Sequence, residues 1–368
     1  MKKIFLVAGE LSGDKLGAWF LQQQHNQTSN FYIEAVGGGF LAAAGAQLYC
    51  KFEKLNVTGI IEIIPKIPFV FSFLNKLSSY ILHSKFEEVV LIDFPGFNMM
   101  LAKKLKQKNK NIKIIYLSPP QLWCWGRWRL KNLRKFCDKL IVLYPFEVDW
   151  YKQQGVDAVW LGTPAFERLQ PYLKKPGQQK STIALIPGSR SKEIDNLFPI
   201  LSKVVQQFIR KTNDINFIIP LAESISKKVI EDKMRKEGLW PYRNNITIIE
   251  GEEDKINAIS SCCLALTKPG TITLELAILG IPTVMFYKTS WLTYFLAKKI
   301  VKINHMALPN LLLQKPVYKE FIQSECKHNL IFNESWTLYK SFLTKSPRYQ
   351  DTKNSLLKIR KLLFKNTN

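Results

Sequence analysis

Short apolar runs alternate with helical patterns along most of this chain, and this alternation limits its fold more than any other feature. Each run has the length of one buried strand and is bounded by glycine, proline or polar residues. Such alternation predicts parallel sheets that are covered by helices on both faces. The predicted strands are residues 4–8, 32–36, 88–92, 113–117, 140–143, 158–161, 182–186, 216–219, 246–250, 264–267 and 283–286.

The length of the chain predicts two α/β domains of this kind. A chain of 368 residues, 46% of them hydrophobic, is too long for one ordinary core. We expect an N-terminal domain at 1–168, a C-terminal domain at 181–345 and a helical tail at 346–368, with a linker at 165–181. Both domains are predicted to be doubly wound and Rossmann-like, facing each other across a cleft at the carboxyl ends of their strands.

The first candidate site is the turn in residues 185–194. Gly188 turns the chain after a predicted strand, and Ser189 and Arg190 open a predicted helix. The N–H groups and the positive dipole end of a helix N-terminus bind anions, and an arginine fork suits a phosphate. The alternative is an ordinary turn whose arginine is solvated or salt-bridged.

A second turn of the same design follows the predicted strand 264–267. Gly270 and Thr271 lead into a helix, and Glu275 lies one turn inside it, where a carboxylate could accept hydrogen bonds from the vicinal hydroxyls of a ribose. The alternative is that Thr271 caps the helix and Glu275 only favours its dipole. Further on, two amides interrupt apolar segments at Asn310 and Gln323.

Polar side chains also follow two strands of the first half. Glu10, Ser12 and Gly13 lie in a glycine-rich loop after the first strand, and Asp93 and Asn98 follow the strand 88–92. The loop lacks the spacing of a dinucleotide fingerprint, so a Rossmann oxidoreductase is not supported. A helix N-cap is the alternative role for Asp93.

Composition limits the partners and the compartment. The net charge of +24 favours polyanions, anionic lipid surfaces or phosphorylated ligands, although lysine could also be a general surface preference. The basic residues form many small groups and no dense tail, which gives little support to nucleic acid. The scattered cysteines and histidines predict no zinc site or disulfide framework and fit a reducing cytosol. The apolar segment 60–82 is interrupted by charges and prolines, so it could lie on a membrane without crossing it.

Taken together, these loops resemble the motifs of lipid-A-disaccharide synthases. Residues 8–18 match the family signature Ala-Gly-Glu-x-Ser-Gly-Asp-x-Leu-Gly-Ala at every fixed position. The later motifs follow in the family's order: Val36-Gly37-Gly38, Val57-x-Gly59-x-x-Glu62, Asp93-x-Pro95-x-Phe97-Asn98, Trp123-x-Trp125, Pro145-Phe146-Glu147, Pro187-Gly188-Ser189-Arg190-x-x-Glu193, Gly270-Thr271-x-x-Leu274-Glu275 and Leu308-Pro309-Asn310. The resemblance covers residues 4 to 325, and it departs from the family pattern at Gly96, often aspartate, and at Thr163, often histidine.

The resemblance implies a glycosyltransferase of the GT-B architecture that works with inversion and without a metal or other cofactor. It implies that UDP-2,3-diacylglucosamine is joined to 2,3-diacylglucosamine 1-phosphate, giving lipid A disaccharide 1-phosphate and UDP. The enzyme is expected in the cytoplasm, peripheral on the inner face of the inner membrane, with no nucleic-acid partner and with a homodimer left open.

The resemblance also implies roles for the site residues. Asp93 is expected as the base, with Glu10 as its main rival, and Ser12, Gly13 and Asn98 as acceptor contacts. For the donor, the diphosphate would lie against Gly188, Ser189, Arg190, Gly270 and Thr271, the ribose against Glu275, and the sugar or diphosphate against Asn310 and Gln323. Acyl chains would follow residues 60–74 and 291–296.

Two alternatives stay open at this point. One is another UDP-GlcNAc-type transferase or an epimerase of the same fold. The other is a basic protein without catalysis that binds membranes or nucleic acid.

Overall fold

The structure of the protein is a computed structural model in which residues 2–25, 31–52, 67–174, 178–212, 214–291, 294–295 and 305–364 are described. Its contacts divide it into two compact units, Met1–Pro164 and Ala165–Asn368. The division follows Pro164 and not residue 168, because α8 (Pro164–Leu169) already packs in the second unit, where the rings of Phe166 and Phe364 lie 6.0 Å apart.

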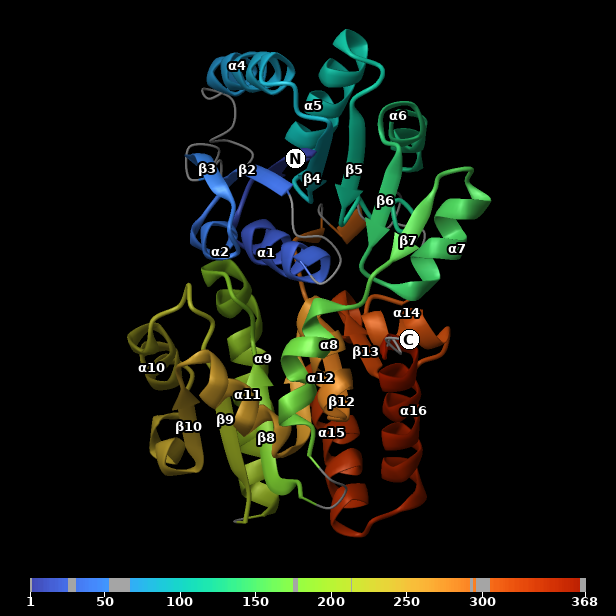
Figure 1. Cartoon of the computed structure of the whole chain (residues 1–368). Coiled ribbons are helices and arrows are strands. Elements are labelled where there is room, and N and C mark those ends of the chain that lie inside the picture. Colours follow the sequence, from blue (N-terminus) through green and yellow to red (C-terminus); the bar gives the residue numbers. More distant parts are fainter. Residues whose placement is uncertain are drawn as a thin grey trace. The chain divides into compact units, whose positions relative to one another are not determined.

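Unit 1 is built on a seven-stranded parallel sheet, shown in the upper, blue to green part of Figure 1. Its strand order is β3-β2-β1-β4-β5-β6-β7. The strands are β1 (Lys2–Ala8), β2 (Phe31–Gly37), β3 (Gln47–Lys51), β4 (Glu88–Ile92), β5 (Lys113–Leu117), β6 (Lys139–Val142) and β7 (Ala158–Trp160).

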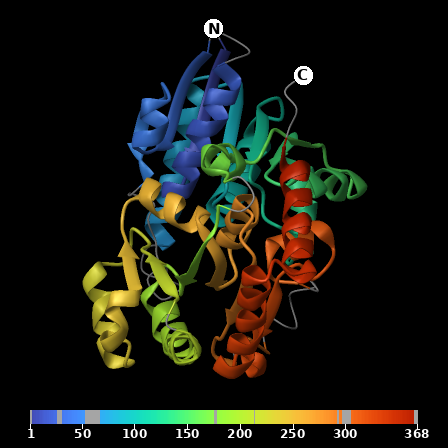
Figure 2. The same cartoon turned by 90° about the horizontal axis from the view of Figure 1, so that it is seen from below.

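Alternating side chains of these strands feed two cores, one on each face of the sheet. From β1, Leu6 and Ala8 enter the core with α1 (Leu11–His25) and α2 (Gly39–Ala43), whereas Phe5 and Val7 enter the opposite core. The opposite core is covered by α4 (Ile67–His83), α5 (Pro95–Lys108), α6 (Leu130–Phe136) and α7 (Pro145–Gln153). The predicted covering of both faces is therefore confirmed, and Figures 1 and 2 show helices on both sides.

Unit 2 repeats this design on a six-stranded parallel sheet of order β10-β9-β8-β11-β12-β13. The strands are β8 (Lys180–Ile186), β9 (Asn216–Pro220), β10 (Ile246–Ile249), β11 (Cys262–Thr267), β12 (Thr283–Tyr287) and β13 (Lys319–Ile322). After α8, the helices are α9 (Ser191–Lys211), α10 (Lys227–Lys236), α11 (Glu252–Ser260), α12 (Thr271–Leu279), α14 (Leu308–Leu313), α15 (His328–Leu343) and α16 (Pro347–Leu363). The C-terminal helix belongs to this unit, since the Tyr349 hydroxyl donates to the Cys263 carbonyl at 2.9 Å.

The predicted strands are present, and the structure adds two that were not predicted, β3 and β13. Both are outermost strands of their sheets, and both are largely half-buried or exposed, with polar residues among the apolar ones. Such strands lack the continuous apolar run that marks a buried parallel strand.

The strand orders place the predicted loops in pairs. In unit 1 the order reverses between β1 and β4, and in unit 2 between β8 and β11. In open α/β sheets, ligands bind outside the carboxyl ends of the strands at such a switch point. The loop with Glu10 therefore lies beside the loop with Asp93, and the turn with Gly188 lies beside the turn with Gly270.

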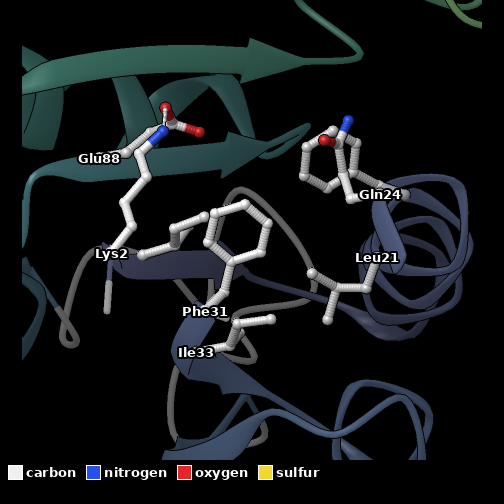
Figure 3. Close-up of a pocket in the computed structure, with 8 residues that line it drawn as sticks. Lys2, Leu21, Gln24, Phe31, Ile33 and Glu88 are labelled. Atoms are coloured by element: carbon white, nitrogen blue, oxygen red, sulfur yellow. Dashed lines mark hydrogen bonds and ion pairs between the residues drawn. The ribbon is translucent and has the colours of Figure 1, made fainter. Parts of the chain in front are cut away.

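A small cavity of about 50 Å³ lies at the opposite, amino-terminal edge of the unit 1 sheet (Figure 3). The Lys2 ammonium lies 2.8 Å from the Glu88 carboxylate there, and the ring of Phe31 closes one side. This cavity lies at the opposite end of the strands from the loops that carry the predicted site residues.

Candidate functional site

A cavity of about 340 Å³ in unit 2 opens at the switch point between β8 and β11. Its walls come from both predicted anion-binding turns, from the start of α12 and from α11. The polar lining residues are Gly188, Ser189, Glu252, Lys255, Lys268, Gly270, Thr271 and Glu275. Five of the eight residues predicted for donor binding therefore line one cavity: Gly188, Ser189, Gly270, Thr271 and Glu275.

The first turn of this cavity holds its backbone groups in a fixed arrangement. Gly188 has φ +137°, and a Cβ atom there would lie 2.5 Å from a carboxylate oxygen of Glu193, so only glycine fits. The Ser189 N–H donates to Glu193 at 3.1 Å, while the Ser189 carbonyl accepts from Ser224 Oγ at 2.6 Å. Arg190 is the exposed N-cap residue of α9, next to the N–H groups of its first turn.

The second turn opens α12 in a similar way. Gly270 is the N-cap residue, with φ +143°, and Thr271 is the first helical residue, so Thr271 does not cap the helix. The Thr273 hydroxyl donates to the Gly270 carbonyl at 2.7 Å and fixes the turn. The N–H groups and the positive dipole end of α12 therefore face a cavity that can receive an anion.

Glu275 lies in the cavity wall with 24% of its side chain exposed, beside a cation that the sequence did not reveal. Arg168 of α8 lies 2.8 Å from the Glu275 carboxylate and also pairs with Glu252, which pairs with Lys255 at 3.0 Å. No local motif marks Arg168, because it reaches Glu275 only through the packing of unit 2.

Asn310 and Gln323, the two amides predicted to contact the donor, form hydrogen bonds within unit 2, and their donor contacts stay a prediction. Asn310 is fully buried, its amide group donates to the Tyr318 carbonyl and to Glu320 at 2.8 Å each, and its oxygen accepts from the Tyr318 N–H. The buried amide of Gln323 bonds to both backbone groups of Thr289. Their polar atoms are therefore engaged within the unit.

In unit 1, Asp93 ends β4 in a strained backbone conformation. Asp93 and Phe94 have φ values of 44° and 47°. This left-handed region is energetically unfavourable for every residue except glycine. Phe94, not Asp93, is the N-cap residue of α5. The Asp93 carbonyl accepts two hydrogen bonds of 2.8 Å, one from the Tyr116 hydroxyl and one from the Asn98 amide.

This arrangement also gives Asn98, a predicted acceptor contact, a structural role. The side chain is fully buried, and its amide nitrogen donates to the carbonyls of Ile92 and Asp93. It holds the Asp93 turn, while its amide oxygen has no hydrogen-bond partner among the described residues, and its contact with the acceptor stays a prediction. Gly13, another predicted acceptor contact, is buried in the first turn of α1, where a Cβ atom would lie 3.4 Å from Ala8, an ordinary contact distance.

The carboxylate of Glu10 lies close enough to Asp93 to influence its titration. Burial raises the pKa of the Asp93 carboxyl above its ordinary value, and repulsion from Glu10 adds to this rise. The loops meet because Gly9 has no side chain: a Cβ atom there would be 2.5 Å from the Phe94 ring. Exposed Ser12 donates to Glu10 at 2.5 Å. Of the residues predicted in the first loop, Glu10 and Ser12 are therefore accessible beside Asp93.

Two further carboxylates fix the loops at this edge. Asp14 is fully buried and accepts from the N–H groups of Gly38, Phe40 and Leu41 at 2.6, 3.0 and 3.2 Å. It thereby ties α1 to the glycine-rich start of α2. The sequence signal was present, since Asp14 is a fixed position of the first motif.

Glu147 performs the same task for the aromatic loop after β5. Its buried carboxylate accepts from the Trp123 indole at 2.8 Å and from the N–H groups of Tyr144 and Leu143. Burial raises the pKa of Glu147 to about 7, although these three donors act to lower it. Trp123 is thus a core residue, whereas Trp125 is exposed.

Some predicted segments lie outside the described residues. These are residues 60–66 of the first apolar segment, with Glu62, and residues 292–293 and 296 of the second, with the lysines that follow it. Of the two departures from the family pattern, Gly96 is exposed and Thr163 is buried, donating to the Leu143 carbonyl at 2.9 Å.

Comparison with solved structures agrees with this fold. The chain matches MurG of Acinetobacter baumannii with a TM-score of 0.57 and 15% identity, covering 98% of this chain and 95% of that one. It matches a UDP-GlcNAc 2-epimerase from Neisseria meningitidis with a TM-score of 0.58 and 13% identity over the full length of both. These likenesses show the GT-B fold.

Comparison of sequences identifies the family. Residues 4–365 match the family described as lipid-A-disaccharide synthetase. The chain is 32% identical to the lipid-A-disaccharide synthase of Acinetobacter baylyi, covering 90% of this chain and 87% of the relative. It is 31% identical to that of Persephonella marina, covering 99% and 95%. The chain therefore belongs to the lipid-A-disaccharide synthase family, the glycosyltransferases that form the disaccharide of lipid A.

Proposed function

We propose that this enzyme joins UDP-2,3-diacylglucosamine to 2,3-diacylglucosamine 1-phosphate with inversion and releases UDP. The observation that carries the donor half is the cavity between β8 and β11, whose two glycine turns present helix N-termini to one space. The Neisseria epimerase of the same fold was solved with UDP-GlcNAc bound, a nucleotide sugar of the same class.

Within the donor cavity, the two turns would receive the diphosphate. Arg190 and the N–H groups at Ser189 and Thr271 would bind its oxygens and stabilise the charge that grows as the glycosidic bond to UDP breaks. Glu275 would accept hydrogen bonds from the ribose hydroxyls. In this proposal neither step requires a metal ion. Among the described residues, no three His, Cys, Asp or Glu side chains gather as metal ligands.

Asp93 is our candidate for the base that takes the proton from the acceptor hydroxyl. Its raised pKa brings the carboxylate closer to the range in which a general base is effective. Glu10 remains the rival, since it lies near Asp93 and is more exposed. Ser12, which donates to Glu10, would contact the acceptor.

We further propose that α4 meets the acyl chains and holds the enzyme at the inner face of the inner membrane. Phe69 and Phe71 are 47% and 50% exposed, and Phe69 borders a cavity of about 450 Å³ that Tyr49, Phe73 and Lys76 also line. An apolar helix face with a nearby lysine suits an anionic lipid surface.

No helix in the described part of the chain has the length and apolar character needed to cross a bilayer.

The test is UDP release from UDP-2,3-diacylglucosamine in detergent, with EDTA, in the presence and absence of 2,3-diacylglucosamine 1-phosphate. We expect release to depend on the acceptor. Release without acceptor would indicate a hydrolase or an epimerase-like activity, and soluble acceptors that react equally well would indicate a different transferase. Light scattering of the same sample would show whether the enzyme is a homodimer.

The base is tested with Asp93→Asn and Glu10→Gln in this assay. We expect Asp93→Asn to lose about 100-fold or more in kcat, the usual contribution of a general base, and Glu10→Gln to lose less. Near-normal turnover of Asp93→Asn would remove the assignment. In the wild type, kcat should decline as the pH falls through the raised pKa of Asp93.

A further inference from the structure

We propose that Lys268 is a further donor-binding residue, whose ammonium group contacts the diphosphate of the nucleotide sugar, and that Glu193 takes the place of a phosphate oxygen until the donor arrives. This inference deepens the proposed function and rests on it. It concerns unit 2 alone.

The strand register places Lys268 between the two anion-binding turns. Thr267, the last residue of β11, is paired with Ile186, the last residue of β8, so Lys268 emerges directly beside the first turn. Its ammonium nitrogen lies 3.0 Å from Glu193 of α9 and 3.8 Å from the position that a Cβ atom of Gly270 would take. One cation therefore lies within reach of both turns.

The Lys268 side chain lies largely buried in the wall of the donor cavity. Only 20% of its side chain is exposed, and it lines the donor cavity together with Gly188, Ser189 and Gly270. Holding an ammonium group there costs solvation and side-chain entropy. A diphosphate would return this cost, since a charge-assisted hydrogen bond to a phosphate oxygen is among the stronger contacts.

The position of Glu193 supports an exchange of anions. One of its oxygens accepts from the Ser189 N–H at 3.1 Å and the other pairs with Lys268. The same N–H and the same ammonium are the donors that a phosphate group would use at this turn. A second anion cannot enter beside Glu193 without repulsion unless Lys268 is shared or Glu193 turns away. The carboxylate thus keeps the donors aligned while the cavity is empty.

The alternative is that Lys268 and Glu193 form an ion pair that only fastens α9 to β11. The two roles differ in what they predict for ligands with and without phosphates. A structural pair would affect uridine and UDP equally, because its loss would deform the whole cavity. A diphosphate contact would affect UDP alone.

The experiment measures the Kd of UDP and of uridine by calorimetry for the wild type, Lys268→Met, Lys268→Arg and Lys255→Met. Lys255 is the matched control, a lysine in the same cavity that pairs with Glu252. We expect Lys268→Met to raise the Kd of UDP by about 10- to 100-fold and the Kd of uridine by less than about twofold. Lys268→Arg should recover most of the UDP affinity. Lys255→Met should change the Kd of UDP and the Kd of uridine by the same factor.

Equal weakening of both ligands by Lys268→Met, or unchanged UDP affinity, would overturn the proposal. Glu193→Gln should lower the Kd of UDP, because the competing carboxylate charge is removed. A higher Kd of UDP in this variant would overturn the role of Glu193 as a substitute anion. If Lys268→Met does not fold, the rate of acetylation of Lys268 in the wild type tests the contact instead. UDP should slow this acetylation and uridine should not, and an acetylation rate that UDP leaves unchanged would refute the contact. A wild type that does not bind UDP at all would instead refute the proposed function.

Discussion

Replacing Asn98 by alanine tests whether the strained turn at Asp93 is held in place for catalysis. The Asn98 amide donates to the carbonyls of Ile92 and Asp93 at 3.1 and 2.8 Å in a fully buried position. Alanine removes both hydrogen bonds and leaves only the Tyr116 hydroxyl on the Asp93 carbonyl. We expect the turn to relax and the Asp93 carboxylate to move.

The magnitude follows from two opposing terms. Two residues in the left-handed region store about 2–6 kcal/mol of strain, at about 1–3 kcal/mol each. The two hydrogen bonds lost with the Asn98 amide contribute about 1–3 kcal/mol together, at about 0.5–1.5 kcal/mol each. Because the two terms are similar in size, the strained turn would no longer be strongly favoured. A relaxed state favoured by about 1.4–2.8 kcal/mol would lower kcat by about 10- to 100-fold.

The assay is acceptor-dependent UDP release, with kcat and KM measured separately and the free energy of unfolding measured in urea. Leu105→Ala is the matched control, since Leu105 is fully buried on the same helix, α5, and does not bond to the Asp93 turn. It should cost about 2–5 kcal/mol in stability but leave kcat within about threefold at temperatures where the protein stays folded. Normal kcat in Asn98→Ala, or an equal loss in Leu105→Ala, would refute the reasoning.

Two other predictions concern charged groups. Arg168→Ala should change the Kd of UDP by less than about fivefold, because a partly exposed ion pair contributes about 0–1 kcal/mol. Glu275→Gln should raise the Kd of UDP by more than about tenfold, because a hydrogen bond from the ribose to a charged group is lost. Equal effects of the two variants in calorimetry would contradict this. Burial raises the pKa of Glu147 from 4.5 to about 7, so between these values the folded protein holds a proton that the unfolded chain has released. Its free energy of unfolding should therefore fall as the pH rises, by up to about 1.4 kcal/mol per unit. Glu147→Gln should flatten this slope in urea titrations at pH 5 and 7, and an unchanged slope would exclude Glu147 as its origin.

The sequence predicted much of the fold because strands of a covered parallel sheet are buried on both faces and therefore consist of continuous apolar runs. The runs at β4, β5 and β11 are fully or almost fully buried, and they were recognised. The strands β3 and β13, each at one edge of its sheet, carry polar residues on half-exposed faces and were not recognised. The turn glycines were also visible, since Gly188 and Gly270 adopt positive φ values that other residues resist.

The sequence alone thus determined the α/β class, the family and the loops that carry polar side chains, because these depend on local patterns and on motif order. The tertiary structure decided which of those side chains are buried and bonded to the protein and which line a cavity. Asn98, Asn310 and Gln323 look like binding residues in the sequence, but each is buried and bonds to backbone groups. Arg168 carried no signal, because only helix packing brings its charge to the donor cavity. Lys268 stands at the start of the second turn, but only the strand register and its pairing with Glu193 give it a role there. A polar residue in a motif shows that hydrogen bonds are needed there, and only the folded chain shows whether a ligand or the protein itself supplies the partner.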